Sequence, residues 1–282
     1  MVEHKEHIEP FINCILELFP KEKNVRAYYV GGCLRSILFP SFSDPLEDWD
    51  ILLLADDRSI LISELNRILC ALKKIYIVSE RENLNPDYTN CKWYYIPPFT
   101  NLKFKIDFIL KWDNEDLDFY SNNLKMEVGN ENVVSLVNKN TYNIPDVFNL
   151  IITKKLILNY FHRDVMFQNT KKTIHIWKRA MKYMKRNWTL SNEISKLFPK
   201  FCSHEEILEP NQICPISHEP LNTISHILKF KCGHSFGAES VFQLFLTNLH
   251  NEYNCNLCNE HIEHIRCPIC RCFITLKNLT ES

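Results

Sequence analysis

The spacing of apolar residues predicts that helices and strands alternate along the first half of the chain. Apolar positions recur three and four residues apart over 8–19 and 60–73, which is typical of helices that bury one face. Short apolar runs at 27–30 and 49–54 are typical of buried strands. A further helix is expected at 33–39, and further strands are expected at 75–78, 93–96 and 103–110. This alternation predicts an α+β domain with a mixed sheet.

The strand signals fade after residue 145, where helical spacing takes over. Residues 147–161 and 171–188 are predicted to be helices, and Pro199 and Pro210 interrupt the pattern that follows. We therefore expect an α+β head at 1–145, a helical neck at 146–200 and a small C-terminal domain at 205–282.

Composition limits the partners and the compartment. The 282 residues are 45% hydrophobic and carry a net charge of −1, so nucleic-acid binding would require a local basic patch. The opening residues, MVEHKEHIEP, lack the apolar core of a secretory signal, and no apolar run reaches the roughly 18 residues of a membrane span. We expect a protein of the cytoplasm or nucleus, in a reducing compartment, with no membrane partner.

Three acidic residues stand in or beside predicted strands. Asp48 and Asp50 are two positions apart, which points their side chains to the same face of a strand. Asp107 interrupts an otherwise mostly apolar strand, where a carboxylate is costly unless it is paired or binds metal. Oxygen ligands of this kind suit Mg²⁺, and a pair of Mg²⁺ ions would give a site for phosphoryl transfer.

A glycine pair lies between the first predicted strand and the helix that follows it. Gly31 and Gly32 would let backbone N–H groups approach phosphates of an NTP, and Arg35 would clamp the triphosphate. Taken alone, an Asp-x-Asp pair is more often a solvated turn, and a Gly-Gly pair is usually just a turn. The order in which these features occur is what favours a functional interpretation.

Four motifs together resemble the CCA-adding enzymes and bacterial poly(A) polymerases of the DNA polymerase β superfamily. They are VGGCLRS (30–36), EDWDILL (47–53), IDFIL (106–110) and LDFYSNNL (117–124). The resemblance implies a polymerase-β-like nucleotidyltransferase head over about residues 10–190, with Mg²⁺ on Asp48 and Asp50. It implies that Asp107 lies near the attacking 3′-hydroxyl. It places the triphosphate on Gly31, Gly32 and Arg35, and it gives Asp118 and Asn122 a role at the neck or the sugar.

The sequence also departs from that family. Ser36 stands where the family has an Asp, and Asp116 and Leu117 replace an Arg pair. The element that selects ATP and CTP is not recognisable; HRDVMFQN (162–169) is the nearest stretch. The base selection of CCA-adding enzymes therefore does not carry over, and the acceptor and the NTP stay open.

The predicted helix at 171–188 has seven basic residues and no acidic one. An apolar stripe along it indicates packing against the rest of the protein. The basic face is either simply solvated or a place where the RNA backbone binds, and we weigh these equally. The residues expected to contact RNA are Lys178, Lys182 and Lys185.

Cysteine and histidine are concentrated near the C-terminus, where eight of the 12 cysteines follow residue 200. Paired ligands at this spacing in a reducing compartment favour Zn²⁺ over disulfides. Only isolated thiols such as Cys202 and Cys272 fit simple burial. The candidate ligands are Cys214, His218, Cys232, His234, Cys255, Cys258, Cys267 and Cys270.

The order of these ligands resembles RING, U-box and SP-RING domains. The resemblance implies one zinc on Cys232, His234, Cys267 and Cys270. Ser217 stands at the second ligand position of the other site, as in U-box and SP-RING proteins, which lack that metal. A second zinc on Cys214, His218, Cys255 and Cys258 stays open, as do alternatives that use His261 or His264. The implied partner is a ubiquitin- or SUMO-conjugating enzyme that contacts Ile216, Pro268 and residues 241–246.

These features support more than one function. The leading hypothesis is a Mg²⁺-dependent nucleotidyltransferase that adds nucleotides from NTP to an RNA 3′ end. The alternative is a RING-type ubiquitin ligase or adaptor whose head is a degenerate RNA- or nucleotide-binding module. A third hypothesis is nucleotide transfer onto a protein or a small molecule.

Overall fold

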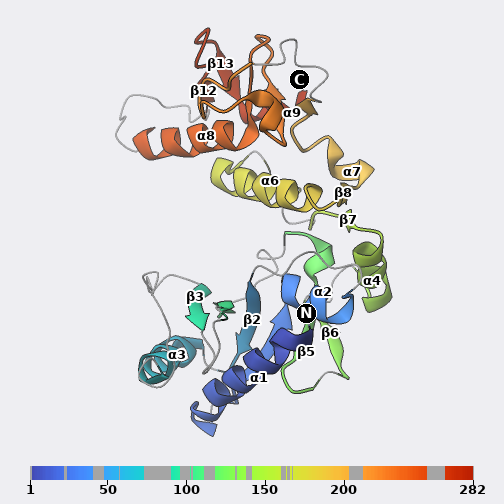
Figure 1. The fold of residues 1–282 in the computed structure, drawn as a ribbon, viewed down its shortest axis with the longest axis vertical. Coiled ribbons are helices and arrows are strands. Elements are labelled where there is room, and N and C mark those ends of the chain that lie inside the picture. The colour runs from blue at the N-terminus through green and yellow to red at the C-terminus, as the bar shows by residue number, and fades with distance from the viewer. Residues whose placement is uncertain are drawn as a thin grey trace. The chain divides into compact units, whose positions relative to one another are not determined.

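The computed structural model divides the chain into two compact units, Met1–Lys155 and Leu156–Ser282 (Figure 1). It describes residues 2–21, 24–40, 48–56, 58–72, 90–95, 102, 104–110, 118–130, 132–137, 142–159, 163, 166, 168–202, 212–252 and 264–281. The predicted neck, 146–200, is divided between the two units. Among the described residues, no helix is long and apolar enough to cross a membrane.

The first unit contains a six-stranded mixed sheet with the order β3-β4-β2-β1-β5-β6. Only β2 and β4 pair in parallel among the paired strands described, and the other neighbours are antiparallel. This confirms the predicted mixed sheet of an α+β domain. The strands are β1 (Arg26–Val30), β2 (Trp49–Leu54), β3 (Asn90–Tyr95), β4 (Phe104–Ile109), β5 (Leu124–Glu127) and β6 (Val134–Leu136).

One face of this sheet is covered by helix α1 (Val2–Glu17). Phe11 of α1 stacks on Tyr95 of β3 with ring centroids 4.0 Å apart, and His7 lies over Phe104 of β4. Alternate residues of a strand point to opposite faces, so Lys105 and Asp107 of β4 face away from α1. Helix α3 (Arg58–Leu72) packs against α1, at one end of the sheet in Figure 1.

Helix α2 (Gly31–Leu38) follows β1 directly and packs on β1, β2 and β5. It begins two residues before the predicted helix at 33–39, at the glycine pair. After β4, the chain forms the 3₁₀ turn η2 (Tyr120–Asn122), which packs against helix α4 (Ile144–Ile152). Asn143 and Asp146 form a reciprocal cap at the start of α4, since each side chain accepts a hydrogen bond from the other residue's backbone N–H.

The first unit differs from the sequence-based expectations at one helix and two strands. The predicted helix 147–161 is wrong beyond Ile152, because the chain turns through Lys154 at a φ of 48° and continues as the strand β7 (Lys155–Leu156). Strands β5 and β6 were not predicted, since their alternating pattern is short and partly polar. The predicted strand at 75–78 lies outside the described residues.

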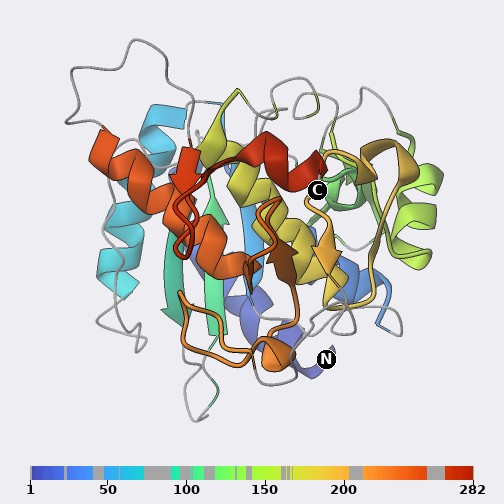
Figure 2. The ribbon, with the colours of Figure 1, turned by 90° about the horizontal axis from the view of Figure 1, so that it is seen from above.

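In the second unit, the basic helix α6 (Thr170–Met184) packs against helix α8 (Ala238–Glu252), and the two lie side by side in Figure 2. Trp177 and Phe242 form the centre of this contact, with ring centroids 5.5 Å apart and both side chains buried. Asn169 caps the start of α6 by accepting from the backbone N–H of Lys172. The predicted neck helix therefore shares a core with the C-terminal domain.

Short strands and turns make up the rest of this unit. A three-stranded sheet has the order β11-β10-β9, and two further pairs are β12-β13 and β7-β8. No strand in these sheets is longer than three residues in the part of the chain that is described. The elements are β8 (Thr189–Leu190), α7 (Asn192–Ser195), β9 (Phe201–Cys202), η4 (Leu221–Thr223), β10 (Ile227–Lys229), β11 (Ser235–Gly237), β12 (His264–Arg266), β13 (Phe273–Thr275) and α9 (Leu276–Glu281).

Candidate metal sites

The three acidic residues meet on the sheet of the first unit. Asp50 of β2 is the direct register partner of Asp107 of β4, because these strands pair in parallel. Asp48 immediately precedes β2 and shares the face of Asp50. One carboxylate oxygen from each of the three lies within 4.8 Å of the others. The sequence identified all three residues, and the parallel pairing brings them together on the face that points away from α1.

A lysine joins this cluster. Lys105 precedes Asp107 by two positions on β4, and its Nζ lies 3.2 Å from Oδ2 of Asp48. The side chains of the pair are 32% and 26% exposed, so solvent screens the attraction in part. Lys105 supplies one positive charge to a group of three carboxylates. Sequence reasoning missed it, although its position two residues from Asp107 was a usable signal.

The glycine turn, Gly31-Gly32 at the start of α2, lies against the same cluster. Gly31 has a φ of +58°, which side chains rarely adopt, and a Cβ there would stand 2.7 Å from Oδ2 of Asp50. Cys33 ties the turn to β2, since its buried Sγ donates to the carbonyl oxygens of Val30 and Asp50 at 3.0 and 3.2 Å. Burial raises the pKa of the Cys33 thiol, which keeps it a neutral donor. The turn and the acidic cluster are therefore one local structure.

Arg35 lies in the interior rather than at the surface of this site. Its side chain is 6% exposed, and Nη1 donates a hydrogen bond to Oδ1 of Asn122, which is 4% exposed. Asp118, just before η2, is also buried. The structure thus brings Arg35 and Asn122 together, from two motifs 87 residues apart. Gly32 lies beside this pair, since a Cβ there would stand 3.8 Å from Nη2 of Arg35.

The acidic cluster has the chemistry of a site for a hard divalent cation. Three carboxylates at this separation repel one another, and a cation bound between them removes that repulsion. The space that Gly31 leaves beside Asp50 is space that any side chain would fill. The three side chains could therefore hold a divalent cation, with Asp50 on β2, Asp48 just before it and Asp107 on β4.

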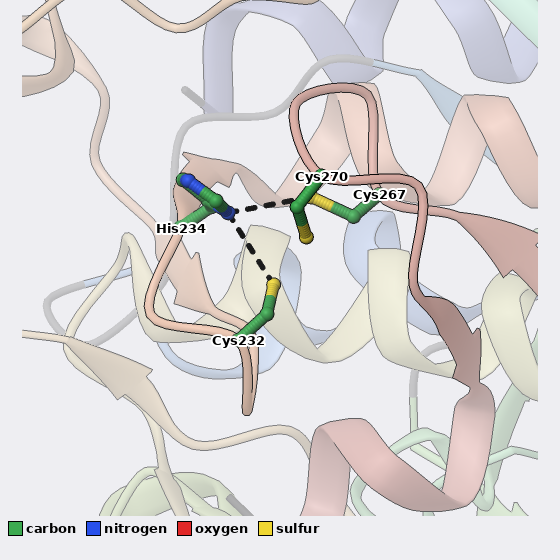
Figure 3. A group of neighbouring side chains, drawn as sticks. All are labelled: Cys232, His234, Cys267 and Cys270. Carbon is green, nitrogen blue, oxygen red and sulfur yellow. Dashed lines mark hydrogen bonds between the residues drawn. The ribbon is translucent and has the colours of Figure 1, made fainter.

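A second ligand cluster, of cysteine and histidine, lies in the second unit. One ligand atom from each of Cys232, His234, Cys267 and Cys270 falls within 4.8 Å of the others. Figure 3 shows Nδ1 of His234 pointing at the sulfurs of Cys232 and Cys267, at 3.5 and 3.6 Å. Three thiols and one imidazole are the donor set of a tetrahedral zinc site. The predicted four residues therefore come together as a group that can hold zinc.

Two tight turns with the same backbone hydrogen bonds stand out in this unit. Cys267 donates its N–H to the carbonyl of Cys272 at 2.8 Å, and Arg271 donates back to Cys267 at 2.9 Å. The turn at Cys214 repeats both bonds, with Glu219 and His218 at the matching positions. Arg271 and His218 also share a positive φ, of 66° and 60°. The repeated letters C-P-I at 214–216 and 267–269 signalled this likeness, which sequence reasoning did not use.

The thiols of the cluster differ in their acidity. Burial raises the pKa of Cys232 and of Cys267. The backbone N–H of Cys272 is the main cause that lowers the pKa of Cys270 to about 6. The lowered pKa of the exposed Cys270 favours its thiolate, which is the form that binds metal.

The second predicted zinc set is covered only in part. Cys255 and Cys258 lie outside the described residues. Cys214 is buried, and its Sγ accepts a hydrogen bond from the backbone N–H of Gly237 at 3.4 Å. Burial would raise the pKa of Cys214, but hydrogen bonds, first from Ser217, outweigh it and lower that pKa. Ser217 thus supports the Cys214 sulfur at the position where Cys270 stands in the matching turn.

The three lysines proposed for RNA binding differ in their surroundings. Lys178 is half-buried, Lys182 is exposed, and Lys185 forms an ion pair with Glu239 of α8 at 3.4 Å. The side chains of that pair are 45% and 71% exposed. The apolar face opposite is wider than the predicted stripe, because Thr173, Ile176 and Tyr183 are buried as well.

The chain was compared with models of protein families and with curated proteins. No protein-family model matches the chain, and a search of curated proteins finds no significant match.

Proposed function

We propose that the chain is a Mg²⁺-dependent nucleotidyltransferase that adds nucleotides from NTP to an RNA 3′ end. The observation that carries the proposal is the convergence of Asp48, Asp50 and Asp107 on two parallel strands, with Gly31 pressed against Asp50. This supports the resemblance to the catalytic head of CCA-adding enzymes and bacterial poly(A) polymerases. The four motifs that carry the resemblance all lie in the first unit.

The reaction joins the 3′-oxygen of the RNA to the α-phosphorus of the NTP and releases pyrophosphate. Mg²⁺ held by Asp48 and Asp50 would supply charge stabilisation for the transferred phosphoryl group. Asp107 is the carboxylate on β4, and we assign to it the role of accepting the proton of the attacking 3′-hydroxyl. The backbone N–H groups at Gly31 and Gly32 would bind the triphosphate, because α2 begins there.

Arg35 and Asn122 have a different role in this proposal. Their hydrogen bond is buried, so Arg35 braces α2 against the η2 turn and so holds the glycine turn in position. This hydrogen bond uses one of the five N–H donors of the Arg35 guanidinium.

The test is incubation of the full chain with each labelled NTP, Mg²⁺ and single-stranded RNA primers. The wild type should extend the primer, and Asp48→Asn or Asp50→Asn should lower the rate by more than about hundredfold, because each removes a direct metal ligand. Asp56→Asn is the matched control, since Asp56 is an exposed acid just beyond β2. Transfer that survives in the Asp48→Asn/Asp50→Asn variant would contradict the proposal. Label that appears on a protein or a small molecule would favour the third hypothesis over an RNA acceptor.

A second candidate is a RING-like module that binds a conjugating enzyme. The matching turns at Cys214 and Cys267 favour this candidate, because each has an isoleucine at the same position. Ile216 is half-buried, and Ile269 is 47% exposed. Within the predicted contact helix, Phe242 and Phe245 are buried, which leaves Gln243 as its exposed residue among 241–246. The test is discharge of ubiquitin- or SUMO-loaded conjugating enzymes by the full chain. Ile216→Ala should abolish any discharge, and a chain that leaves every loaded enzyme intact would remove this candidate.

A further inference from the structure

A fifth thiol, predicted from the sequence to be an isolated one, lies against the cysteine-histidine cluster. Cys272 follows Cys270 by two positions, and the two sulfurs lie 3.3 Å apart. Cys272 therefore contacts one of the four expected ligands directly.

The backbone explains why Cys272 lies there. Its carbonyl accepts the N–H of Cys267, which closes the turn and holds residue 272 across from residue 267. Glu219 occupies the same position in the matching turn and is exposed, whereas Cys272 is half-buried. A thiol stands at this position only in the turn that belongs to the zinc cluster.

We propose that Cys270 and Cys272 are alternative fourth ligands of one zinc ion, with Cys232, His234 and Cys267 as the fixed three. A tetrahedral zinc site has room for one of the two. Rotation of the two side chains exchanges them, because their sulfurs lie 3.3 Å apart and Cys270 already belongs to the group of four. One thiol of the pair therefore stays free while the metal is bound. This inference is independent of the nucleotidyltransferase proposal.

Zinc retention in the full chain tests the exchange. Wild type, Cys270→Ser, Cys272→Ser, the Cys270→Ser/Cys272→Ser variant and the control Cys70→Ser are purified and dialysed against the same chelator. Cys70 is an exposed cysteine of the first unit. Each single variant should keep as much zinc as the wild type and the control, and the double variant should lose one equivalent.

Two results would overturn the proposal. If Cys270→Ser alone loses the equivalent, Cys270 is the sole fourth ligand. If the double variant keeps it, neither thiol is a ligand. Cobalt substitution gives a second readout that does not depend on chelator strength: the thiolate-to-cobalt band should keep its intensity in both single variants and decrease in the double variant.

Alkylation of the zinc-loaded wild type tests the free thiol. Mass spectrometry after brief iodoacetamide treatment should find chains modified at Cys270 or at Cys272 and none modified at both. Modification of Cys272 alone would show that the exchange does not occur.

Discussion

The two ligand clusters resemble each other in compactness and differ in what holds them. Each gathers its ligand atoms within 4.8 Å. The acidic cluster stands on β2 and β4, in the interior of a six-stranded sheet with buried apolar side chains on both strands. The cysteine-histidine cluster stands on tight turns between strands of three residues. The first cluster stands on strands inside a large sheet, and the second stands on turns beside the core that α8 forms with Phe236 and Ile265.

This difference predicts what metal does in each unit. Ladder hydrogen bonds and apolar burial hold β2 and β4 in register without help from a cation. The turns of the second cluster are held by few strand hydrogen bonds, so metal bound there would add its binding free energy to their folding. We therefore expect metal to serve chemistry in the first unit and folding in the second.

The largest expected effect comes from removing a fixed zinc ligand. Cys267→Ser or strong chelation should unfold the second unit, because structural zinc contributes about 10–16 kcal/mol of apparent binding free energy, as much as the stability of a typical domain. Asp50→Asn should leave the first unit folded. Hydrogen exchange measured by mass spectrometry on the full chain would report both units at once.

The control for this experiment is Cys14→Ser, a half-buried cysteine in α1. It should leave exchange in the second unit unchanged. If the amides of the second unit stay protected from exchange both in chelator and in Cys267→Ser, the apolar core of that unit is sufficient for its folding. The contrast between the two clusters would then be wrong.

Much of the secondary structure of the first unit could be predicted from the sequence, because apolar spacing and short motifs are local signals. β1, β2 and β4 were each predicted within two residues, and the acids and glycines were found by spacing alone. The parallel pairing that sets Asp50 opposite Asp107 is a tertiary fact, and so is the hydrogen bond from Arg35 to Asn122. Neither leaves a periodic pattern in the sequence.

The second unit was harder to predict because turns and packing define it. Cys272 was predicted to be isolated because the four-ligand set was already complete without it, and only the closed turn brings it to the cluster. The basic helix was correctly predicted as α6, but its partner was not, because burial of Trp177 against Phe242 joins residues 65 positions apart. Apolar faces show that a helix packs without showing what it packs against.

The next largest effect should come from Gly31→Ala. The left-handed backbone costs an alanine roughly 1–2 kcal/mol, and the new Cβ would stand 2.7 Å from Oδ2 of Asp50. We expect a modest loss of stability and loss of nearly all nucleotide transfer, because Asp50 must move. Thermal unfolding and primer extension measure the two effects separately.

Substitutions at two other glycines distinguish backbone strain from displacement of the Asp50 side chain. Gly129 also has a positive φ, of +79°, but a Cβ there meets only Oε1 of Glu9, at 3.9 Å, so Gly129→Ala should lower stability and keep transfer. Gly32→Ala has no positive φ and an ordinary 3.8 Å contact with Arg35, so it should affect transfer less than Gly31→Ala. Equal loss of transfer in Gly31→Ala and Gly129→Ala would show that strain, rather than the position of Asp50, is responsible.

A smaller effect is expected on the basic face of α6. Charge reversal at Lys178 and Lys182 should weaken RNA binding and reduce the slope of log affinity against log salt by about 0.7 for each lost phosphate contact. Lys185→Glu should do less, because Glu239 already pairs with Lys185. Fluorescence anisotropy over a salt series measures the slope. Lys229→Glu, an exposed reversal on β10, is the control, and an unchanged slope in the α6 variants would mean that this face is only solvated.

The smallest effect should be the pH dependence of His226, which is 8% exposed beside Lys185 and Glu239. Burial, followed by the charge of Lys185, lowers the pKa of His226 below its ordinary value of 6.5, although Glu239 raises it. Below pH 6.5 the unfolded chain therefore binds more protons at His226 than the folded chain does. The contribution of His226 to the free energy of unfolding is complete above that pH and is lost as the pH falls.

His226→Gln should lose less stability than the wild type between about pH 7.5 and pH 5.5. Zinc release on acidification affects both chains alike, so the difference between their denaturation midpoints reports His226. His175→Gln, on the exposed side of α6, should follow the wild type, and a His226→Gln curve parallel to the wild type would show that this histidine does not titrate with folding.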